Sequence, residues 1–382
     1  MSKFLLTGAR APVTLEISRN LAKHNHEVYL ADSLRFPIAK NSNSIKKSFY
    51  VRQPRFKYAA FIDDLIDIII KHKIDYLIPT CEEVFYISHA KDKLSKCCNV
   101  ICTDFNSISK MHDKYTILSM IDGCGGVIAP GTKIVKYKDV NNYSSLFEKL
   151  ILKKRFCRFG TDVIVNLDAK KVSKLKLSDD DEVLLQNKII GEEYCSYSVA
   201  VDGVLTAHCT YLPRYRLSGS ASLYFKPVFN NVIYEFVKLF VKKHRYTGQI
   251  SFDFIANTKG MFLIECNPRA SSGVHLLSDD NLASIFVDST NIVDANVVRD
   301  PAAIKLLMLI MMLPLEVAKF NLNTWWSDFK IAKDVISMNG DKGFFLYQII
   351  SLAELVYLSI KLKKSMRVVA TYDIEWDGDN IV

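Results

Sequence analysis

The sequence contains few of the short motifs that would identify a common binding domain. It has no zinc-finger spacing, no RNA-binding signature and no arginine-rich tract, so nucleic acid is not an expected partner. No segment has the pattern of a secretory signal, and nine cysteines without such a signal predict reduced thiols in the cytoplasm rather than a disulfide framework. Cys97, Cys98 and Cys102 form the only close group, and their spacing matches no common zinc site.

Long hydrophobic runs are also scarce. The apolar stretch 304–315 is too short to span a membrane and contains Pro314. The stretch 343–362 has the length, but Gln348 and Glu354 interrupt it and lysines follow it. We therefore expect a buried helix in a C-terminal lobe and no membrane contact. The alternatives for this apolar region are a lid, a dimer surface or contact with a membrane surface.

Length and composition predict a globular protein of two or three lobes. The chain has 382 residues and a mass of 43.5 kDa, with 49% hydrophobic and 24% charged residues. The net charge of +9 comes mostly from lysines spread along the chain. A positive balance fits anionic ligands such as ATP, although it is also common in proteins that bind no nucleotide.

The first hundred residues have the pattern of a parallel α/β sheet. Residues 3–8 and 27–32 are predicted strands on either side of a helix, which is a βαβ opening of Rossmann type. Only one glycine, Gly8, stands in the first turn and Pro12 follows it, so the G-x-G-x-x-G fingerprint of NAD-binding proteins is absent.

Two acids follow the next predicted strand of this lobe. Strand 75–80 leads directly into Glu82 and Glu83, and a last strand is expected at 99–102. Ligands of parallel sheets bind at the carboxyl ends of the strands, so these acids are candidates for substrate contact. Acids at the beginning of a helix are the equally good alternative.

The most informative segment is a hairpin of two strands near residue 260. If Thr258–Gly260 forms a three-residue turn, residue 257 pairs with 261 and Asp253 pairs with Glu265. Alternation would place Glu265 and Asn267 on one face of the strand, with Phe262 and Ile264 on the other. Asp253, Glu265 and Asn267 would then form a group of hard oxygen ligands that suits Mg²⁺, or Mn²⁺, bridging nucleotide phosphates. A hairpin with a merely solvated polar face is the alternative.

This arrangement resembles the signature of the ATP-grasp superfamily, in which an acid on one strand is followed by Glu-x-Asn-Pro-Arg on the next. Here that segment runs from Glu265 to Arg269. The resemblance covers roughly residues 1–300 and is closest to the group of carbamoyl phosphate synthase and its small stand-alone carboxylate–amine ligase relatives. It implies an α/β and α+β protein with a Rossmann-like pre-ATP-grasp lobe (1–105), an ATP-grasp module (106–300, with subdomains 106–186 and 187–300) and a mainly helical C-terminal lobe (301–382).

The resemblance also implies which side chains bind the phosphates. Lys114 matches the basic residue at the start of the first ATP-grasp subdomain, and Lys153 matches the strand lysine that reaches the phosphates. The family usually follows this strand with a glycine-rich loop, but here loop 156–161 has one glycine. Arg158 would supply by its side-chain charge what backbone amides supply elsewhere. A solvated surface residue is the alternative for either lysine alone.

The nucleoside would lie against the connection between the two subdomains. Gln186 replaces an acid of the family, but its carbonyl can still accept a hydrogen bond from the adenine amino group. The backbone of Asn187, Lys188 and Ile189 would supply the other adenine hydrogen bonds. Glu193 is the candidate for the ribose hydroxyls, with Glu192 as the alternative.

The remaining candidates concern the substrates. Arg269 would contact the transferring phosphoryl group, and residues 271–275 would line the acceptor channel. Arg214 and Arg216 are candidates for binding the substrate carboxylate, because an arginine fork matches a carboxylate. His208 would assist proton removal from an amine, with a structural histidine in a strand as the alternative.

The family chemistry implied is an ATP-dependent ligation of a carboxylate to an amine or a thiol. A carboxylate attacks the γ-phosphate, an acyl phosphate and ADP form, and a nucleophile then displaces phosphate. The expected partners are small-molecule carboxylates and amines, with a homodimer possible. The alternatives are a bicarbonate-activating module, as in carbamoyl phosphate synthase, and a catalytically inactive ATP-binding module.

Overall fold

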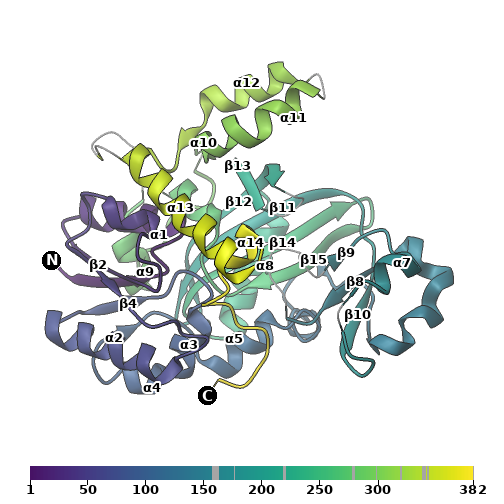
Figure 1. Ribbon diagram of the computed structural model, residues 1–382, viewed down its shortest axis with the longest axis horizontal. Helices are drawn as coiled ribbons and strands as arrows, with labels where there is room; N and C mark the ends of the chain where they lie inside the picture. The colour runs from purple at the N-terminus through teal and green to yellow at the C-terminus, as the bar shows by residue number, and fades with distance from the viewer. Residues whose placement is uncertain are drawn as a thin grey trace.

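The computed structural model contains three β-sheets joined by helices (Figure 1). The first sheet lies at the N-terminal side, the largest sheet occupies the middle, and a small antiparallel sheet stands at the opposite end. Helices of the C-terminal part lie above the middle sheet and across the N-terminal lobe. The structure describes residues 1–156, 163–175, 177–217, 221–277, 280–297, 299–318, 321–337, 341 and 344–381.

The first sheet is parallel throughout, in the order β3-β2-β1-β4-β5. Its strands are mostly apolar because helices cover both faces, as in other parallel sheets. The predicted α/β lobe is therefore confirmed, and only β3 was not predicted. The elements are β1 (Lys3–Thr7), α1 (Pro12–Lys23), β2 (Glu27–Asp32), β3 (Lys47–Tyr50), α2 (Tyr58–His72), β4 (Tyr76–Ile78), α3 (Val84–His89), α4 (Lys91–Leu94) and β5 (Asn99–Val100).

The second sheet is small and antiparallel, in the order β7-β10-β8-β9. One face packs on the long 3-10 segment Tyr137–Lys149 and forms its own small core around Leu152, Val183 and Leu185. The other face is therefore left to meet the rest of the protein. The strands are β7 (Thr132–Lys136), β8 (Leu150–Lys154), β9 (Val163–Ile164) and β10 (Glu182–Asn187).

The third sheet has the order β17-β16-β13-β12-β11-β14-β15-β6 and is antiparallel over its long strands. Helix α8 (Asn231–Lys243) covers one face with five apolar residues at helical spacing, and all five are buried. The strands are β6 (Val127–Ile128), β11 (Glu192–Val201), β12 (Val204–Leu217), β13 (Ala221–Val228), β14 (Gly248–Asn257), β15 (Gly260–Asn267), β16 (Ala302–Ala303) and β17 (Lys333–Asp334).

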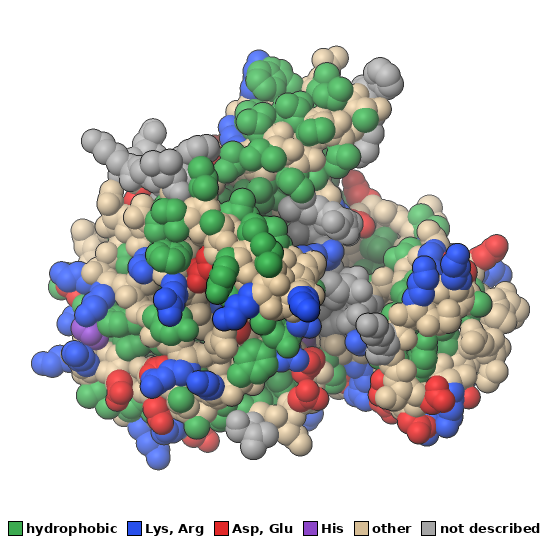
Figure 2. Space-filling view, viewed as in Figure 1, with side chains coloured by type: hydrophobic (Ala, Val, Ile, Leu, Met, Phe, Trp, Pro, Cys, Tyr) green, Lys and Arg blue, Asp and Glu red, His purple; other side chains and the backbone are tan. Residues whose placement is uncertain are grey.

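The C-terminal part is mainly helical, as predicted. It has a core of its own around Trp325, which packs on strand β13 through Leu223 and Tyr224. Hydrophobic side chains also gather on its surface (Figure 2). Among the described residues, no helix is both long enough and apolar enough to cross a membrane. The helices are α10 (Lys305–Leu307), a π-helical turn (Met308–Met312), α11 (Leu313–Ala318), α12 (Leu322–Ile331), α13 (Phe344–Leu362) and α14 (Met366–Val369).

The domain limits remain predictions, but two features of the sheets bear on them. The expected division between residues 186 and 187 falls inside strand β10. Strand β6 pairs with β15, so a segment assigned to the first subdomain joins the sheet of the second. The last residues also leave the helical lobe, because Asp373 and the residues after it pack on the N-terminal lobe.

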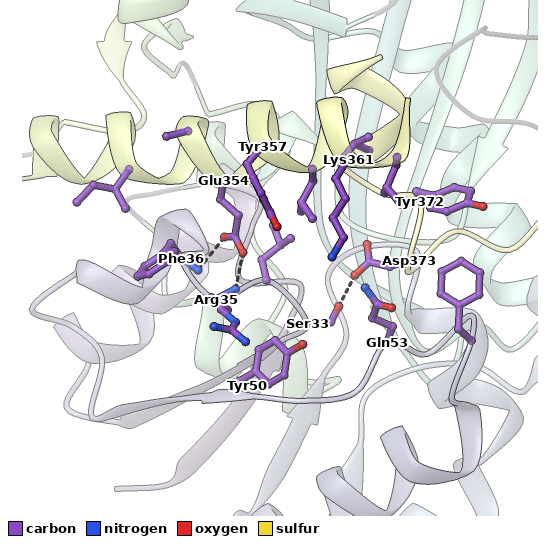
Figure 3. A pocket seen from close by; sticks show the side chains of 17 residues that line it. Ser33, Arg35, Phe36, Tyr50, Gln53, Glu354, Tyr357, Lys361, Tyr372 and Asp373 are labelled. Atoms are coloured by element: carbon purple, nitrogen blue, oxygen red, sulfur yellow. Dashed lines mark hydrogen bonds between the residues drawn. The ribbon is translucent and has the colours of Figure 1, made fainter. Parts of the chain in front are cut away.

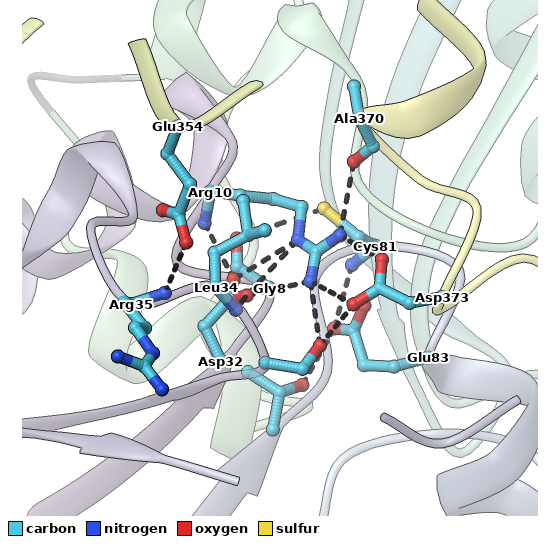
Figure 4. A network of polar contacts seen from close by, with 12 residues as sticks. Gly8, Arg10, Asp32, Leu34, Arg35, Cys81, Glu83, Glu354, Ala370 and Asp373 are labelled. Atoms are coloured by element: carbon cyan, nitrogen blue, oxygen red, sulfur yellow. Dashed lines mark hydrogen bonds and ion pairs between the residues drawn. The ribbon is translucent and has the colours of Figure 1, made fainter. Parts of the chain in front are cut away.

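A buried charge network fixes this C-terminal segment (Figure 4). The Arg10 guanidinium donates to Asp32 at 2.7 Å and to Asp373 at 2.6 Å, and Ser33 donates to Asp373 at 2.5 Å. Burial alone would lower the pKa of Arg10, but the two carboxylates outweigh it and raise the pKa well above its ordinary value. One arginine therefore joins residues at the two ends of the chain.

We predict that Arg10→Leu lowers the free energy of unfolding by about 3–5 kcal/mol, because it leaves two buried carboxylates without their cation. Urea denaturation measures the change. Arg52→Leu is the matched control: Arg52 pairs with Asp64 on an exposed surface, where such a pair contributes under about 1 kcal/mol. Equal stability of the two variants would show that the network does not hold the C-terminal segment.

Candidate active site

The hairpin of β14 and β15 pairs Asp253 with Glu265, as predicted, but by a different route. The turn has two residues, Thr258 and Lys259, so Asn257 pairs with Gly260 rather than with Met261. A β-bulge beside Asp253 then inserts one extra residue into β15 and restores the pairing of the two acids. The three-residue turn was wrong, and the bulge compensates for it.

The bulge also changes which side chains share a face. The residues of β15 that face the core are Met261, Leu263 and Cys266. These core-facing residues are two positions apart before the bulge and three positions apart across it. The prediction that Phe262 faces away from Asn267 is therefore wrong, because both lie on the side opposite the core. A simple alternation cannot show this shift, since the extra residue at a bulge breaks the period of two.

Three basic or amide groups surround the carboxylate of Glu265. Lys114 Nζ lies 3.2 Å from Glu265 Oε2, and Asn267 Nδ2 donates to Glu265 Oε1 at 3.0 Å. Burial alone would raise the pKa of Glu265, but Lys114, Asn267 and Lys153 outweigh it and hold the pKa below its ordinary value. Burial and the neighbouring Glu265 raise the pKa of Asp253. Two carboxylates forced together in this way fit a divalent cation.

The second sheet supplies Lys153 from β8. Lys153 pairs with Leu184, and alternation places Lys153, Leu184 and Gln186 on one face of this sheet, opposite its small core. The Lys153 side chain is buried, and its charge acts on Glu265 across the two sheets. The structure therefore brings Lys114 and Lys153 to the carboxylate pair. Arg158 lies outside the described residues.

Gln186 has one unsatisfied polar atom in a buried position. Its Nε2 donates to Thr132 Oγ1 at 2.9 Å, whereas Oε1 is buried and has no hydrogen-bond donor among the described residues. A buried carbonyl without a donor is rare in proteins, and an adenine amino group has the chemistry to satisfy it.

The backbone beyond Gln186 fits the expectation less well. The N–H of Asn187 donates to Gly131 O and the N–H of Lys188 donates to Lys149 O, each at 2.8 Å. These two amides are already used within the protein, so they do not provide the expected hydrogen bonds to adenine. Within the segment 187–189, the backbone groups left to bind adenine are the carbonyl oxygens and the backbone of Ile189.

Strand β11 distinguishes the two candidate acids for the ribose. Cys195 pairs with Asp253, and Glu193 lies two residues away on the same face. Glu192 lies on the opposite face, where it accepts a hydrogen bond from Tyr194. Arg216 pairs with Glu193, and its charge also acts on Asp253. Glu193 and Arg216 therefore belong to the cluster, and Glu192 does not.

Arg214 and His208 lie away from this cluster. Arg214 pairs with Asp328 of α12 at 3.0 Å, so it connects the third sheet to the helical lobe. His208 lies on the sheet face covered by α8, opposite to Asp253, and its two ring nitrogens contact the hydroxyls of Ser198 and Thr210. Burial lowers the pKa of His208 to about 3. The structure gives it the position of a buried structural histidine.

Arg269 has a partner that the sequence did not reveal. Its Nε lies 2.6 Å from Glu82 Oε1, and its Nη2 donates to Asn267 Oδ1 at 3.0 Å. Glu82 therefore binds an arginine, a partner that neither the prediction of substrate contact nor that of a helix terminus included. The adjacent Glu83 accepts hydrogen bonds from Thr7 and from the backbone of its own loop. The signal in the sequence was an acid at the carboxyl end of a parallel strand.

A cavity of about 660 Å³ opens beside this ion pair. Glu82 contributes from the first sheet, Arg155 and Phe156 from the end of β8, and Trp376 from the C-terminal segment. Arg155 is fixed by Asp113 and Glu182, and the Trp376 and Phe156 rings lie 5.1 Å apart. The contribution of the C-terminal segment could not be predicted, because nothing local to residues 370–381 indicates where they pack.

A second cavity, of about 620 Å³, lies between the N-terminal lobe and α13 (Figure 3). Tyr357 and Lys361 line it from the helix, and Tyr50 lines it from the end of β3. Glu354 accepts the backbone N–H groups of Arg35 and Phe36, and so anchors the helix to the lobe. Tyr372 lines both cavities and marks the boundary between them.

Comparison with known proteins finds likeness in structure. No protein-family model and no curated protein sequence matches the chain. It is similar to the ADP complex of N5-carboxyaminoimidazole ribonucleotide synthetase, PurK (TM-score 0.61, 11% identity, 78% of this chain and 80% of that chain). It is also similar to an L-amino acid ligase from Bacillus licheniformis (TM-score 0.60, 11% identity, covering 79% and 78%).

A third similar structure is the biotin carboxylase domain of the 2-oxoglutarate carboxylase from Hydrogenobacter thermophilus, solved with MgADP and bicarbonate. Its TM-score is 0.60 at 14% identity, and the match covers 79% of this chain and 74% of that one. All three are ATP-grasp enzymes. Together with the arrangement of the three sheets, these matches show that the chain has the ATP-grasp fold.

Proposed function

We propose that this protein is an ATP-dependent ligase that joins a carboxylate to an amine or a thiol through an acyl phosphate, with release of ADP and phosphate. The observation that carries the proposal is the cluster of Asp253, Glu265, Lys114, Lys153 and Arg269 at the meeting point of the sheets. Carboxylates that can hold a metal ion lie beside cations that can neutralise phosphate charge, and phosphoryl transfer uses both.

The oxygen ligands of the cluster form the proposed metal site. Asp253, Glu265 and Asn267 would hold Mg²⁺, and Mn²⁺ is an alternative ion. No group of three or more Asp, Glu, His or Cys side chains within the described part of the chain forms a metal site by itself. Mg²⁺ is often held by one or two carboxylates together with substrate phosphates, and when bound it neutralises phosphate charge.

The cations would act on the phosphates and the substrate. Lys153 and Lys114 would contact phosphate oxygens, with Lys114 also holding the Glu265 carboxylate. Arg269 would stabilise the negative charge that develops during transfer to the carboxylate. Glu82 keeps the Arg269 guanidinium in one position, because the pair is buried and hydrogen-bonded. Glu82 is in this sense a positioning residue.

The nucleoside would extend from this cluster towards the second sheet. Gln186 Oε1 would accept from the adenine amino group, and Glu193 would contact the ribose hydroxyls after separating from Arg216. The cavity of about 660 Å³ beside Glu82 is the proposed space for the substrates, since it is lined by Glu82, the partner of Arg269, and by residues at the end of β8.

Gln186→Leu tests the adenine contact. We expect ADP to bind roughly tenfold to 100-fold more weakly, because the exocyclic amino group loses its acceptor. Calorimetric titration measures this. IDP has no amino group at this position and is the matched control, so its affinity should change little. An equal loss for both nucleotides would contradict the assignment of Gln186 to the adenine.

The pH dependence of Mg²⁺ binding tests the carboxylate pair. The pKa of Asp253 is raised, so the carboxyl takes up a proton at a higher pH than an ordinary aspartate. Mg²⁺ needs the ionised form, and its affinity should therefore fall by up to about tenfold per pH unit as the pH drops below neutral. Asp253→Asn should weaken Mg²⁺ binding and remove most of this pH dependence. An unchanged pH profile would place the ion elsewhere.

Turnover is tested with Mg²⁺-ATP, pools of carboxylates and hydroxylamine as a general acceptor. We expect hydroxamate and ADP in equal amounts, and at least about 100-fold less of both from Glu265→Gln. Glu235→Gln is the control, because the Glu235 side chain is 44% exposed on α8 and, among the described residues, pairs with Lys238 alone. Hydroxamate with AMP would contradict the acyl phosphate. Mg²⁺-ATP binding without product from any pool would favour an inactive module, and activity with bicarbonate alone would favour a bicarbonate-activating enzyme.

A further inference from the structure

Helix α13 carries apolar side chains on the side that faces solvent. Ile349, Leu352, Val356 and Ile360 follow one another at intervals of three, four and four residues, which places them along one side of the helix. Their side chains are between 40% and 74% exposed. The opposite side of the helix closes the cavity of about 620 Å³ against the N-terminal lobe, so packing within the chain accounts for only one side.

The apolar surface continues over the neighbouring helices. Figure 2 shows hydrophobic side chains gathered along α13 and over the lobe of α10–α12, on the same face of the molecule. Exposed apolar areas this extensive are unusual in monomeric proteins and mark contact surfaces. The exposed apolar residues on these helices are Leu309, Ile310, Met311, Leu315, Val317, Leu322, Trp326, Ile331, Ile349, Ile350, Leu352, Val356, Tyr357, Ile360 and Leu362.

The acids of this region are all engaged within the protein. Segment 304–366 contains five acids. Asp328 binds Arg214, Asp341 binds Arg19, and Glu354 binds backbone N–H groups of the N-terminal lobe. The other two act in the same way: Glu316 is buried against Asn321, and Asp334 accepts N–H groups of its own loop.

The lysines have the opposite arrangement. The same segment contains eight lysines, and of those that the structure describes only Lys333 forms an ion pair, with Asp300. Lys330 lies over the exposed ring of Trp326. The surface therefore combines apolar side chains, a Trp ring and positive charge, and the acids of the segment bind partners within the protein.

We infer that this face, defined by α13 and the helices α10–α12, binds the surface of a membrane that contains anionic lipid. Apolar side chains enter the boundary of the acyl chains, Trp326 favours the level of the headgroups, and lysines contact lipid phosphates. A second copy of the chain fits less well, because a two-fold interface would bring one positively charged face against another. The inference is independent of the proposed ligase activity.

Sedimentation with lipid vesicles tests the inference. The full-length protein should sediment with vesicles of phosphatidylcholine and phosphatidylglycerol in equal parts, and at least about tenfold less with phosphatidylcholine alone. Binding should weaken as salt is added, because screening shortens the reach of the lysine charges. Lys330→Glu combined with Lys363→Glu should weaken it by at least about tenfold.

Ile349→Asp combined with Ile360→Asp should also reduce vesicle binding by at least about tenfold, since it places charge within the apolar stripe. Ile70→Asp combined with Ile292→Asp is the matched control, because these isoleucines are similarly exposed on other surfaces. Unchanged circular dichroism spectra and thermal melting curves would show that both variants are folded.

Three results would overturn the inference. One is that the wild-type protein sediments with neither vesicle. Another is that the control variant loses as much binding as the α13 variant. The third is a concentration-dependent dimer in analytical ultracentrifugation that the α13 variant abolishes, which would assign the face to a second copy of the chain.

Discussion

The buried ion pair between Glu82 and Arg269 is the contact on which the arrangement of the candidate site depends. It joins the carboxyl end of a strand in the first sheet to the end of β15 in the third. Arg269 then binds Asn267, Asn267 binds Glu265, and Glu265 binds Lys114. Removing one partner of a buried pair leaves a charge without compensation. The N-terminal lobe is therefore part of the site, because it holds the arginine that orders the carboxylates.

The sequence predicted the elements of this site better than their connections. The hairpin of β14 and β15 and the first two parallel strands depend on residues close together in the chain, and local pattern reveals such features. The bulge beside Asp253 could not be predicted, because an extra residue leaves no mark in an alternating pattern. The pairing of Arg269 with Glu82 spans 187 residues and that of Arg10 with Asp373 spans 363, and periodicity carries no information at such separations.

In the proposed function the nucleotide lies between two ATP-grasp subdomains, and the C-terminal segment is a third element beside them. Arg10 anchors it through Asp373, and Trp376 then packs among Phe85, Phe105 and Phe156. Phe156 is the last described residue before the loop expected to cover the phosphates. Any movement of Phe156 must therefore change its contact with the Trp376 ring. The cavity beside Glu82 shares walls with this segment, so the C-terminal residues help to set its shape.

Helix α13 shows why hydrophobicity alone did not predict its environment. An apolar stretch interrupted by Gln348 and Glu354 is typical of a buried helix, and both residues do face the protein: Gln348 is buried, and Glu354 binds the N-terminal lobe. What the sequence could not show is how much of the remaining surface other elements cover. One side closes a cavity and the other remains exposed, because nothing in the described chain packs on the stripe at Ile349 and Ile360. The membrane surface that we infer would cover the apolar residues on that side, and the lysines beside them favour an anionic one.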